Sequence, residues 1–451
     1  MMRLKLAMAR VLRMLSRRVG RRGGTTLPGR VLLRLDSGTI AMLGKRLERG
    51  SVVVSATNGK TTTSSMLAAV LEAAGAEVVH NRAGSNMNWG VATALLDAGR
   101  TPGQIGLFEV DEAWLAPVAR DLDPSLILLS NLFRDQLDRY GELELLADRW
   151  AELVAERDGR STFVLNADDP LVADLGRERR RVVYFGVEDR SHSLEALEHA
   201  SDSKRCRNCG HEYVYEAVYL GHLGRYRCPN CGRERPHPQV AAETVTLRGM
   251  AGSDVRIATP AGAIELSLPL PGLYNVYNAL AATAAALELG ASPWQVRDAL
   301  GAFAAAFGRV ERLRVNGREL AILLVKNPAG ANEVLRTLTL EGGALDLWIA
   351  LNDGIADGRD ISWIWDADFE VLAGRVRHIT CSGTRAEEMA LRLKYAGVDG
   401  EITVERDLGR SLDSAVAAGN GQPLYALPTY TALLELRDLL ADRGLARRWS
   451  D

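Results

Sequence analysis

The hydrophobic residues of this chain fall into short runs, separated by longer stretches in which they recur every three or four positions. A short apolar run is typical of a buried strand, and the longer repeat, as in Leu143–Glu156, is typical of an amphipathic helix. Strands that alternate with helices form parallel sheets. The pattern therefore predicts an α/β fold, with strands at Val52–Ser55, Ile105–Val110, Leu126–Leu129, Thr162–Leu165 and Val182–Phe185.

The alternation stops near Ser191. A polar stretch containing His and Cys runs from there to about Pro238 and predicts an insert in the first domain. After it we expect strands at Glu243–Arg248 and Ala263–Leu268, and then helices around Asn275–Leu289 and Pro293–Ala305.

A second α/β pattern opens near Asn316 and predicts a doubly wound, Rossmann-like domain. Its strands are expected at Leu320–Val325, Asp346–Leu351, Val376–Ser382, Glu401–Glu405 and Pro423–Leu427, and its helices at Ala331–Leu338, Arg385–Tyr395, Ser411–Ala418 and Thr431–Arg443. The length of 451 residues fits about three domains. We divide the chain into a basic N-terminal segment (1–40), a central domain (41–312) with an insert at about 192–240, and a C-terminal α/β domain (313–451).

Composition narrows the classes of function. The hydrophobic share of 47% and the charged share of 25% are ordinary for a globular protein. The net charge of −2 gives no general attraction to nucleic acid. No apolar run reaches membrane-spanning length, and no secretory signal is evident. We expect a cytoplasmic protein.

Charge is concentrated at the N-terminus. The first 35 residues contain ten Lys or Arg and no acidic residue, and Met1–Val19 places its basic residues at roughly helical spacing. Such a segment either lies on the anionic inner face of the plasma membrane or packs as an ordinary surface helix, and the sequence leaves both open. A mitochondrial transit peptide would look similar.

Four cysteines form two pairs of the same pattern, each followed by glycine. They are Cys206 and Cys209 before Gly210, and Cys228 and Cys231 before Gly232, with 18 residues between the pairs. Two such knuckles supply the four thiolates of a tetrahedral Zn²⁺ site. Because a four-thiolate site has no open position for substrate, we interpret the zinc as structural. The fifth cysteine, Cys381, is expected in a buried strand.

A phosphate-binding loop follows the first predicted strand. The segment Ala56–Thr63 reads ATNGKTTT and precedes an amphipathic stretch, Ser64–Ala74. A strand, a Gly-Lys-Thr turn and a helix point backbone N–H groups at phosphates. Lys60 would neutralise phosphate oxygens, and Thr61 would offer a hydroxyl to Mg²⁺. We assign nucleotide binding to Thr57, Asn58, Gly59, Lys60, Thr61 and Thr62.

Several further segments, in this order, resemble the Mur ligase family. Glu109, which ends a strand beside the loop, stands where the family places a magnesium-binding glutamate, and its neighbours Asp111 and Glu112 are alternatives. The stretch Asn131–Gly141 resembles an aspartate-rich family segment, although Gln136 replaces its usual histidine. The resemblance implies that Asn275 and Asn278 contact adenine, and that Arg309, in the Gly-Arg-x-Glu hinge Gly308–Glu311, reaches the nucleotide phosphates. It implies ATP and Mg²⁺ as cofactors.

Two departures select a branch of that family. Amino-acid-adding Mur ligases carry a carbamylated lysine after the aspartate-rich segment, whereas this chain has no lysine between Lys60 and Lys204. The segment Val325–Glu333 also lacks the aspartate that the family places before its Asn-Pro. In these departures, in the four-cysteine insert and in the segments Asp357–Asp366 and Tyr425–Thr431, the chain resembles the MurT family, the ligase subunits of lipid II isoglutaminyl synthase.

That resemblance implies ATP-dependent amidation of the D-glutamate α-carboxylate in the lipid II stem peptide, through an acyl phosphate, in peptidoglycan synthesis. The chain shows no glutaminase signature, so ammonia is expected from a separate glutamine amidotransferase subunit of the GatD type. The resemblance suggests that an aspartate of the acidic loop Asp353–Asp366 completes the partner's Cys-His pair. Asp357 and Asp360 are the candidates, and the sequence does not choose between them.

Two alternatives remain open. An amino-acid-adding ligase of the Mur or folylpolyglutamate type would share the fold but would need a lysine in the 140–200 interval. A zinc-ribbon nucleic-acid protein with a phosphate-loop motor would need a basic, aromatic-lined face. The chain shows only modest basic clusters such as Arg177–Arg181.

Overall fold

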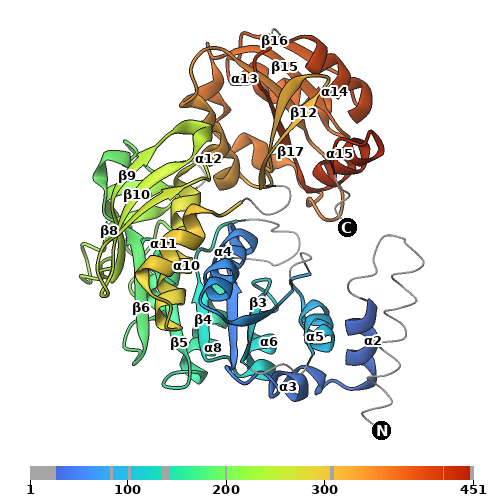
Figure 1. Cartoon of the computed structure of the whole chain (residues 1–451). Helices are drawn as coiled ribbons and strands as arrows, with labels where there is room; N and C mark the ends of the chain where they lie inside the picture. The colour runs from blue at the N-terminus through green and yellow to red at the C-terminus, as the bar shows by residue number, and fades with distance from the viewer. Residues whose placement is uncertain are drawn as a thin grey trace.

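The computed structural model describes residues 27–81, 85–99, 103–134, 143–198, 201–304, 309–419 and 421–446. The basic stretch Met1–Val19 and the residues 135–142 lie outside this part. The described residues contain two large sheets, and each sheet is covered by its own helices. The C-terminal sheet lies above the larger one in Figure 1.

The larger sheet has nine strands in the order β11-β10-β9-β6-β5-β4-β1-β3-β2. Strands β1 to β6 are parallel, as predicted, and β9, β10 and β11 extend the sheet as an antiparallel ribbon. Their bounds are β1 (Ser51–Ser55), β2 (Glu77–His80), β3 (Gln104–Glu109), β4 (Leu126–Leu129), β5 (Thr162–Asn166), β6 (Val182–Val187), β9 (Val240–Leu247), β10 (Ser253–Ala258) and β11 (Ile264–Leu268).

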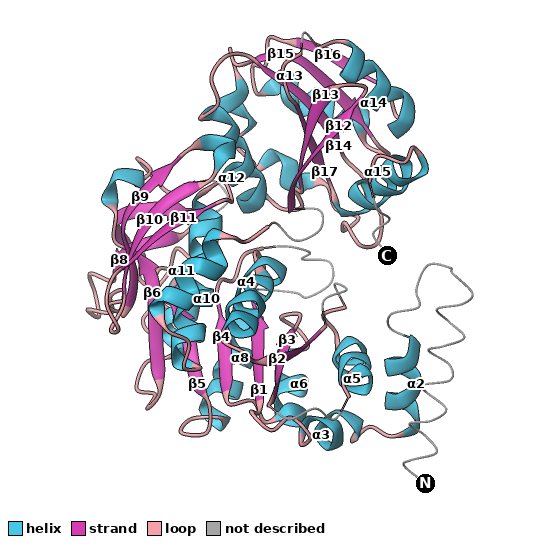
Figure 2. Cartoon of the chain, in the orientation of Figure 1, coloured by secondary structure: helices cyan, strands magenta, loops and turns pink. Residues whose placement is uncertain are grey.

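Helices cover both faces of this sheet (Figure 2). Successive residues of a strand point to opposite faces, so Val52 and Val54 of β1 join one hydrophobic core and Val53 joins the other. The first core includes α4 (Lys60–Ala73), α10 (Leu273–Glu288) and α11 (Pro293–Gly301). The second includes α2 (Leu27–Leu35), α3 (Thr39–Gly44), α5 (Asn88–Asp97), α6 (Leu115–Leu122), α8 (Leu143–Glu156) and α9 (Pro170–Leu175).

The C-terminal sheet has six strands in the order β12-β13-β17-β14-β15-β16. All pairs are parallel except β12 with β13. The strands are β12 (Arg309–Val315), β13 (Arg318–Leu323), β14 (Leu345–Ala350), β15 (Val376–Ser382), β16 (Glu401–Val404) and β17 (Leu424–Pro428). One face packs on α12 (Pro328–Thr339) and α13 (Ala386–Tyr395), and the other on α14 (Leu408–Ala417) and α15 (Tyr430–Asp442). Cys381 is fully buried in β15, as expected.

The insert forms an antiparallel hairpin of β7 (Val214–Leu220) and β8 (Leu223–Arg227). The polar stretch 192–240 predicts the insert, but the sequence pattern does not predict this hairpin, nor strands β2, β10 and β12. Strand β12 reads Arg-Val-Glu-Arg-Leu-Arg-Val, and its many charged residues are typical of a linker. It is a strand because it pairs with β13 at the edge of the sheet. Among the described residues, no helix combines the length and hydropathy that a membrane span requires.

Candidate active site and zinc centre

The predicted phosphate loop has the expected strand–turn–helix layout. Strand β1 ends at Ser55, and α4 begins at Lys60. Gly59 has φ +84°, and a Cβ atom there would lie 2.1 Å from the side-chain oxygen of Asn278. Only glycine fits both the left-handed backbone and this close approach. The loop therefore presents the N-terminus of α4, the end of a helix that favours anions.

Lys60 points toward carboxylates at the end of β3. Its Nζ atom lies 2.7 Å from Oε2 of Glu112, and both side chains are buried. Burial acts to lower the pKa of Lys60, but Glu112 and Asp111 outweigh it and hold that pKa above its usual value. The lysine therefore stays charged, and Glu112 is engaged as its counter-ion.

Glu109 is the acidic side chain next to the loop hydroxyl. The Thr61 hydroxyl donates to Oε1 of Glu109 at 3.0 Å. Asn81 holds the backbone of Glu109 from both sides, because it accepts from the Glu109 N–H at 2.9 Å and donates to its carbonyl at 2.8 Å. A carboxylate and a hydroxyl at this spacing suit the oxygen-preferring Mg²⁺, so these two residues would hold the ion beside the phosphates.

The two predicted adenine-contacting asparagines lie in the first turns of α10. Asn278 accepts from the Thr63 hydroxyl at 3.1 Å and donates to the side chain of Asn275 at 3.0 Å. Asn275 in turn donates to the carbonyl of Pro271 at 2.8 Å. This chain of hydrogen bonds fixes both amides relative to the phosphate loop.

The phosphate loop and these two asparagines border a pocket between the two sheets. Its walls come from the phosphate loop, α10, the β7–β8 turn and the C-terminal domain, and include Asn58, Gly59, Thr62, Asn275, Asn278, Leu220, Leu223, Leu323, Lys326 and Glu333. A concave, largely apolar pocket with a few polar groups is typical of a small-molecule site.

The C-terminal domain contributes polar groups that the sequence analysis did not assign to the site. Lys326 Nζ lies 3.4 Å from the carbonyl oxygen of Thr57, so a second lysine reaches the phosphate loop. Asn327 caps α12 by accepting from the N–H of Gly330 at 2.9 Å. The sequence does contain a signal for these two residues. Lys326 and Asn327 stand between a predicted strand and a predicted helix, and ligands of α/β sheets bind at the loops that follow the carboxyl ends of the strands.

Glu333 is a buried carboxylate at the same pocket. It lies on α12 with its oxygen 2.7 Å from Arg336. Burial raises the pKa of Glu333 to about 7, against the opposing effect of Arg336. Nothing local in the sequence marks this residue, because its burial depends on the contact between α12 and the central domain.

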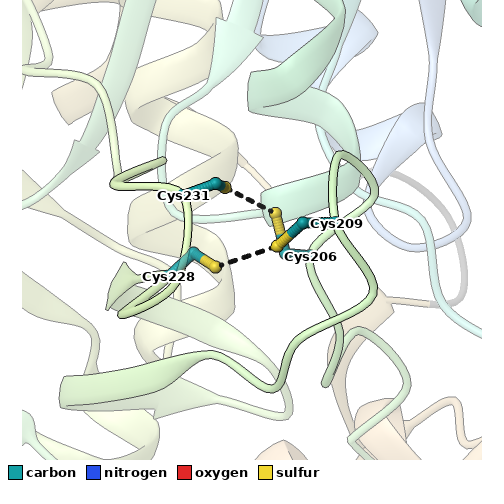
Figure 3. Close-up of side chains that lie close together, drawn as sticks. All are labelled: Cys206, Cys209, Cys228 and Cys231. Atoms are coloured by element: carbon teal, nitrogen blue, oxygen red, sulfur yellow. Dashed lines mark hydrogen bonds between the residues drawn. The ribbon is translucent and has the colours of Figure 1, made fainter.

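The four predicted zinc ligands come together (Figure 3). Their sulfur atoms all lie within 4.8 Å of one another, with Cys206–Cys231 at 3.6 Å and Cys209–Cys228 at 3.4 Å. A tetrahedral zinc with bonds of about 2.3 Å separates its sulfur ligands by about 3.8 Å, so the cluster fits this ion.

Both knuckles use the same turn. Gly210 and Gly232 each have φ +74°, and their N–H groups donate to the carbonyls of Cys206 and Cys228 at 2.8 and 3.0 Å. An ion pair between Arg233 and Asp174, at 2.6 Å, then attaches the second knuckle to α9 of the central domain.

The two candidate aspartates of the acidic loop differ in their surroundings. Asp357 is 7% exposed and accepts from the N–H of Thr431 at 2.8 Å, in the first turn of α15, and from the Thr431 hydroxyl. Asp360 is exposed and accepts from the N–H of Ser362 at 2.8 Å, which lowers its pKa. Arg309 opens β12, but its side chain lies outside the described part.

Comparisons with known proteins agree with this architecture. Residues 54–232 match the Mur ligase middle domain family, and residues 324–433 match the MurT ligase C-terminal family. The chain is 33% identical over 434 residues to the subunit MurT of lipid II isoglutaminyl synthase (glutamine-hydrolyzing) from Staphylococcus aureus strain N315, covering 96% of each protein. It is also 33% identical to the corresponding subunit of Streptococcus pneumoniae strain R6, covering 96% of this chain and 95% of that one.

A solved structure shows the same fold at lower identity. The pseudomurein peptide ligase type C of Methanothermus fervidus superimposes with a TM-score of 0.70 at 22% identity, over 89% of this chain and 80% of that one.

Proposed function

This chain belongs to the MurT family of Mur ligases, and on that basis we propose that it amidates the D-glutamate α-carboxylate of the lipid II stem peptide, using ATP and ammonia, in peptidoglycan synthesis. The chain is a ligase by family membership. The substrate, the acyl phosphate and the glutaminase partner belong to the proposal.

The arrangement of Lys60, Thr61 and Glu109 carries the proposal, at a phosphate loop whose Gly59 and Thr62 line the interdomain pocket. Lys60 is a buried, charged ammonium, and the Thr61–Glu109 pair offers two oxygens 3.0 Å apart. Mg²⁺, when bound there, would neutralise charge on the phosphates. The residues thus provide positive charge where phosphoryl transfer develops negative charge.

The reaction needs this charge because a carboxylate is a poor electrophile. An oxygen of the substrate carboxylate attacks the γ-phosphorus, and ADP departs, which leaves an acyl phosphate. Ammonia then attacks the acyl carbon, loses a proton and expels inorganic phosphate, which leaves the amide. Lys60 stabilises the phosphates in the first step, and the pocket walls position both reactants.

The loop Asp353–Asp366 supports the presence of a partner subunit. Within it, Ile355 is 76% exposed, and Trp365, which is 49% exposed, contacts Tyr395 edge-on at 5.6 Å between ring centroids. Exposed aromatic side chains are enriched at protein–protein interfaces. We propose that a glutaminase of the GatD type docks here and supplies the ammonia.

Of the two loop aspartates, we propose Asp360 as the one that orients the partner's histidine. A carboxylate that must meet a second protein has to be accessible and charged, and Asp360 is exposed with a lowered pKa. Asp357 is buried against Thr431, and burial raises its pKa. Asp357 is therefore assigned to holding the loop on α15.

We propose that the protein works in the cytoplasm. The basic residues within positions 1–35 would bring it to the inner face of the plasma membrane, where their charge favours anionic lipid.

Reconstitution tests the proposed function. The chain is mixed with a glutaminase partner, ATP, glutamine and lipid II, and the product is analysed by mass spectrometry for the small mass decrease of amidation. We expect product in the complete mixture, and also without the partner when ammonium replaces glutamine. Transfer of an amino acid in place of ammonia would instead support an amino-acid-adding ligase.

A further inference from the structure

We infer that the turn of the zinc insert, Leu220–Leu223, is a wall of the nucleotide pocket, so that zinc bound at the four cysteines strengthens ATP binding. The inference rests on the proposed function, in that it takes the interdomain pocket to hold ATP. The insert would then position ATP in addition to stabilising the fold.

The turn reaches the pocket directly. Leu220 and Leu223, the last residue of β7 and the first of β8, both line it and are 5% and 2% exposed. Asn275 and Asn278 of α10 line the same pocket. Two side chains of the insert therefore share one cavity with the residues assigned to adenine.

The tip of the turn packs on the segment that follows β4. The ring of His222 lies 4.6 Å from the ring of Phe133. Gly221 has φ +56°, and a Cβ atom there would lie 2.8 Å from the Phe133 ring. Glycine is thus required at the tip both for its backbone conformation and for this close approach.

The segment under the turn holds the phosphate loop in place. The N–H of Phe133 donates to the Thr57 hydroxyl at 3.1 Å, and the side chain of Asn131 accepts from the N–H of Asn58 at 2.9 Å. The Asn131–Phe133 segment therefore contacts both the insert turn and the loop that would hold the phosphates.

A second contact ties the turn to the same segment. His222 lies 3.3 Å from Asp169, and Asp169 accepts from the N–H of Leu132 at 2.9 Å. Asp169 opposes the effect of burial and raises the pKa of His222.

The turn is also linked to the cysteines. The hydroxyl of Tyr215 donates to the carbonyl of His222 at 3.0 Å, and its ring lies 6.0 Å from that of Tyr226. Tyr226 packs in one small core with Cys206 and Cys228. The sulfur cluster and the pocket wall are therefore two ends of one packed hairpin.

Glu198 extends this linkage to the C-terminal domain. It accepts from the N–H of Gly221 and, at 2.7 and 2.8 Å, from Asn332 and Arg336 of α12. Through Glu198, the insert turn is thus linked to the C-terminal domain as well as to the central domain.

The physical reason for the coupling is the weakness of the isolated hairpin. A two-stranded hairpin is marginally stable in water by itself, and four thiolates without a metal ion do not hold two knuckles together. Loss of zinc would release the wall formed by Leu220 and Leu223. Because coupling between two binding equilibria is reciprocal, ATP should strengthen zinc binding by the same factor.

Pocket-wall variants test the inference. The full chain with both Leu220→Ala and Leu223→Ala is compared with wild type by calorimetric titration of ATP with Mg²⁺, while zinc content and melting temperature are measured on the same samples. We expect ATP affinity to fall by about tenfold or more, since apolar contact area is removed, with one zinc retained. Val214→Ala, an exposed position at the other end of β7, is the matched control and should leave the affinity unchanged.

A second experiment measures zinc affinity in protein whose pocket wall is unchanged. Zinc affinity is measured by equilibrium competition with a chelator, with and without saturating ATP and Mg²⁺. We expect ATP to raise zinc affinity several-fold in the wild type and not in Lys60→Ala, which controls for zinc bound by ATP in solution.

The outcomes separate the two proposals. Zinc-loaded Leu220→Ala/Leu223→Ala protein that binds ATP within twofold of wild type would overturn the inference and leave the proposed function standing. If that variant loses zinc or unfolds, the zinc measurement on wild type decides: a zinc affinity that ATP does not change would overturn the inference. Wild-type protein that binds no ATP would overturn the proposed function and this inference with it.

Discussion

Asn58 in the phosphate loop and Asn327 at the N-cap of α12 exchange two side-chain hydrogen bonds, at 3.3 and 2.9 Å, across 269 positions of the chain. Each amide donates to the oxygen of the other. This pair joins the central domain to the C-terminal domain at the edge of the pocket.

Asn327→Ala should lower both stability and ATP affinity. The change removes the helix cap together with the bond to Asn58, and cap loss costs about 1 kcal/mol of unfolding free energy. Asn58→Ala removes only the interdomain pair. A double-mutant cycle with urea unfolding should give a coupling of about 0.5–1 kcal/mol between the two residues, and additive effects would contradict the pairing.

Lys60→Ala should abolish ATP-dependent amidation and leave the fold intact. One cation facing the transferred phosphoryl group in a dry site is expected to contribute on the order of several kcal/mol to transition-state stabilisation. Turnover is measured with ammonium as nitrogen donor, and circular dichroism reports on the fold. Lys45→Ala, at an exposed lysine, is the control, and retained turnover in Lys60→Ala would refute the nucleotide-site assignment.

The purified protein should contain one zinc per chain. Cys209→Ser should lower the zinc content and the melting temperature without removing a catalytic group, because three ligands hold the ion less tightly than four. Cys381→Ser, at the cysteine outside the cluster, should keep its zinc. Substoichiometric zinc in carefully prepared wild type would count against the site.

Asp360→Asn should separate the two nitrogen sources. With free ammonia it should amidate lipid II normally, because activation of the carboxylate uses Lys60 and Glu109. With glutamine and the partner it should lose a factor on the order of 10²–10⁴, the contribution of a residue that orients a catalytic histidine.

Asp357→Asn is the matched variant in the same loop. It should lose about 1 kcal/mol of stability, since it weakens the bonds to Thr431, and keep both activities. Loss of ammonia-dependent activity in both variants would place the aspartates in the ligase site instead. Full glutamine-dependent activity in both would make the loop structural.

Stability should depend on pH through Glu333. Its pKa is raised from 4.5 to about 7 in the folded protein, so folding takes up a proton between these values. The free energy of unfolding should therefore fall as pH rises from about 4.5 to 7, by about 3 kcal/mol for this group, and stay level above that range.

The comparison with Glu333→Gln isolates this effect. Urea unfolding of wild type, this variant and the exposed-site control Glu152→Gln at pH 5 and pH 8 measures it. We expect Glu333→Gln alone to gain stability over wild type at the higher pH. Parallel pH profiles for all three proteins would show that Glu333 does not titrate in this window.

Local features of this protein follow from the sequence because their causes are local. The turn at Gly59–Lys60 needs a glycine next to a lysine, the two Cys-x-x-Cys-Gly knuckles need a left-handed glycine each, and apolar periodicity separates strands from helices. These features are readable from neighbouring residues alone, and the order of such motifs along the chain is enough to recognise the family.

Only the tertiary structure decided which distant residues meet. The pairing of Lys60 with Glu112, the burial of Asp357 against Thr431, and the approach of Gly221 to Phe133 each join residues on different elements. Such contacts are set by how the sheets and the insert pack, and no short-range pattern encodes their distances. Asp357 and Asp360 thus look alike in sequence, whereas packing on α15 buries one and leaves the other exposed.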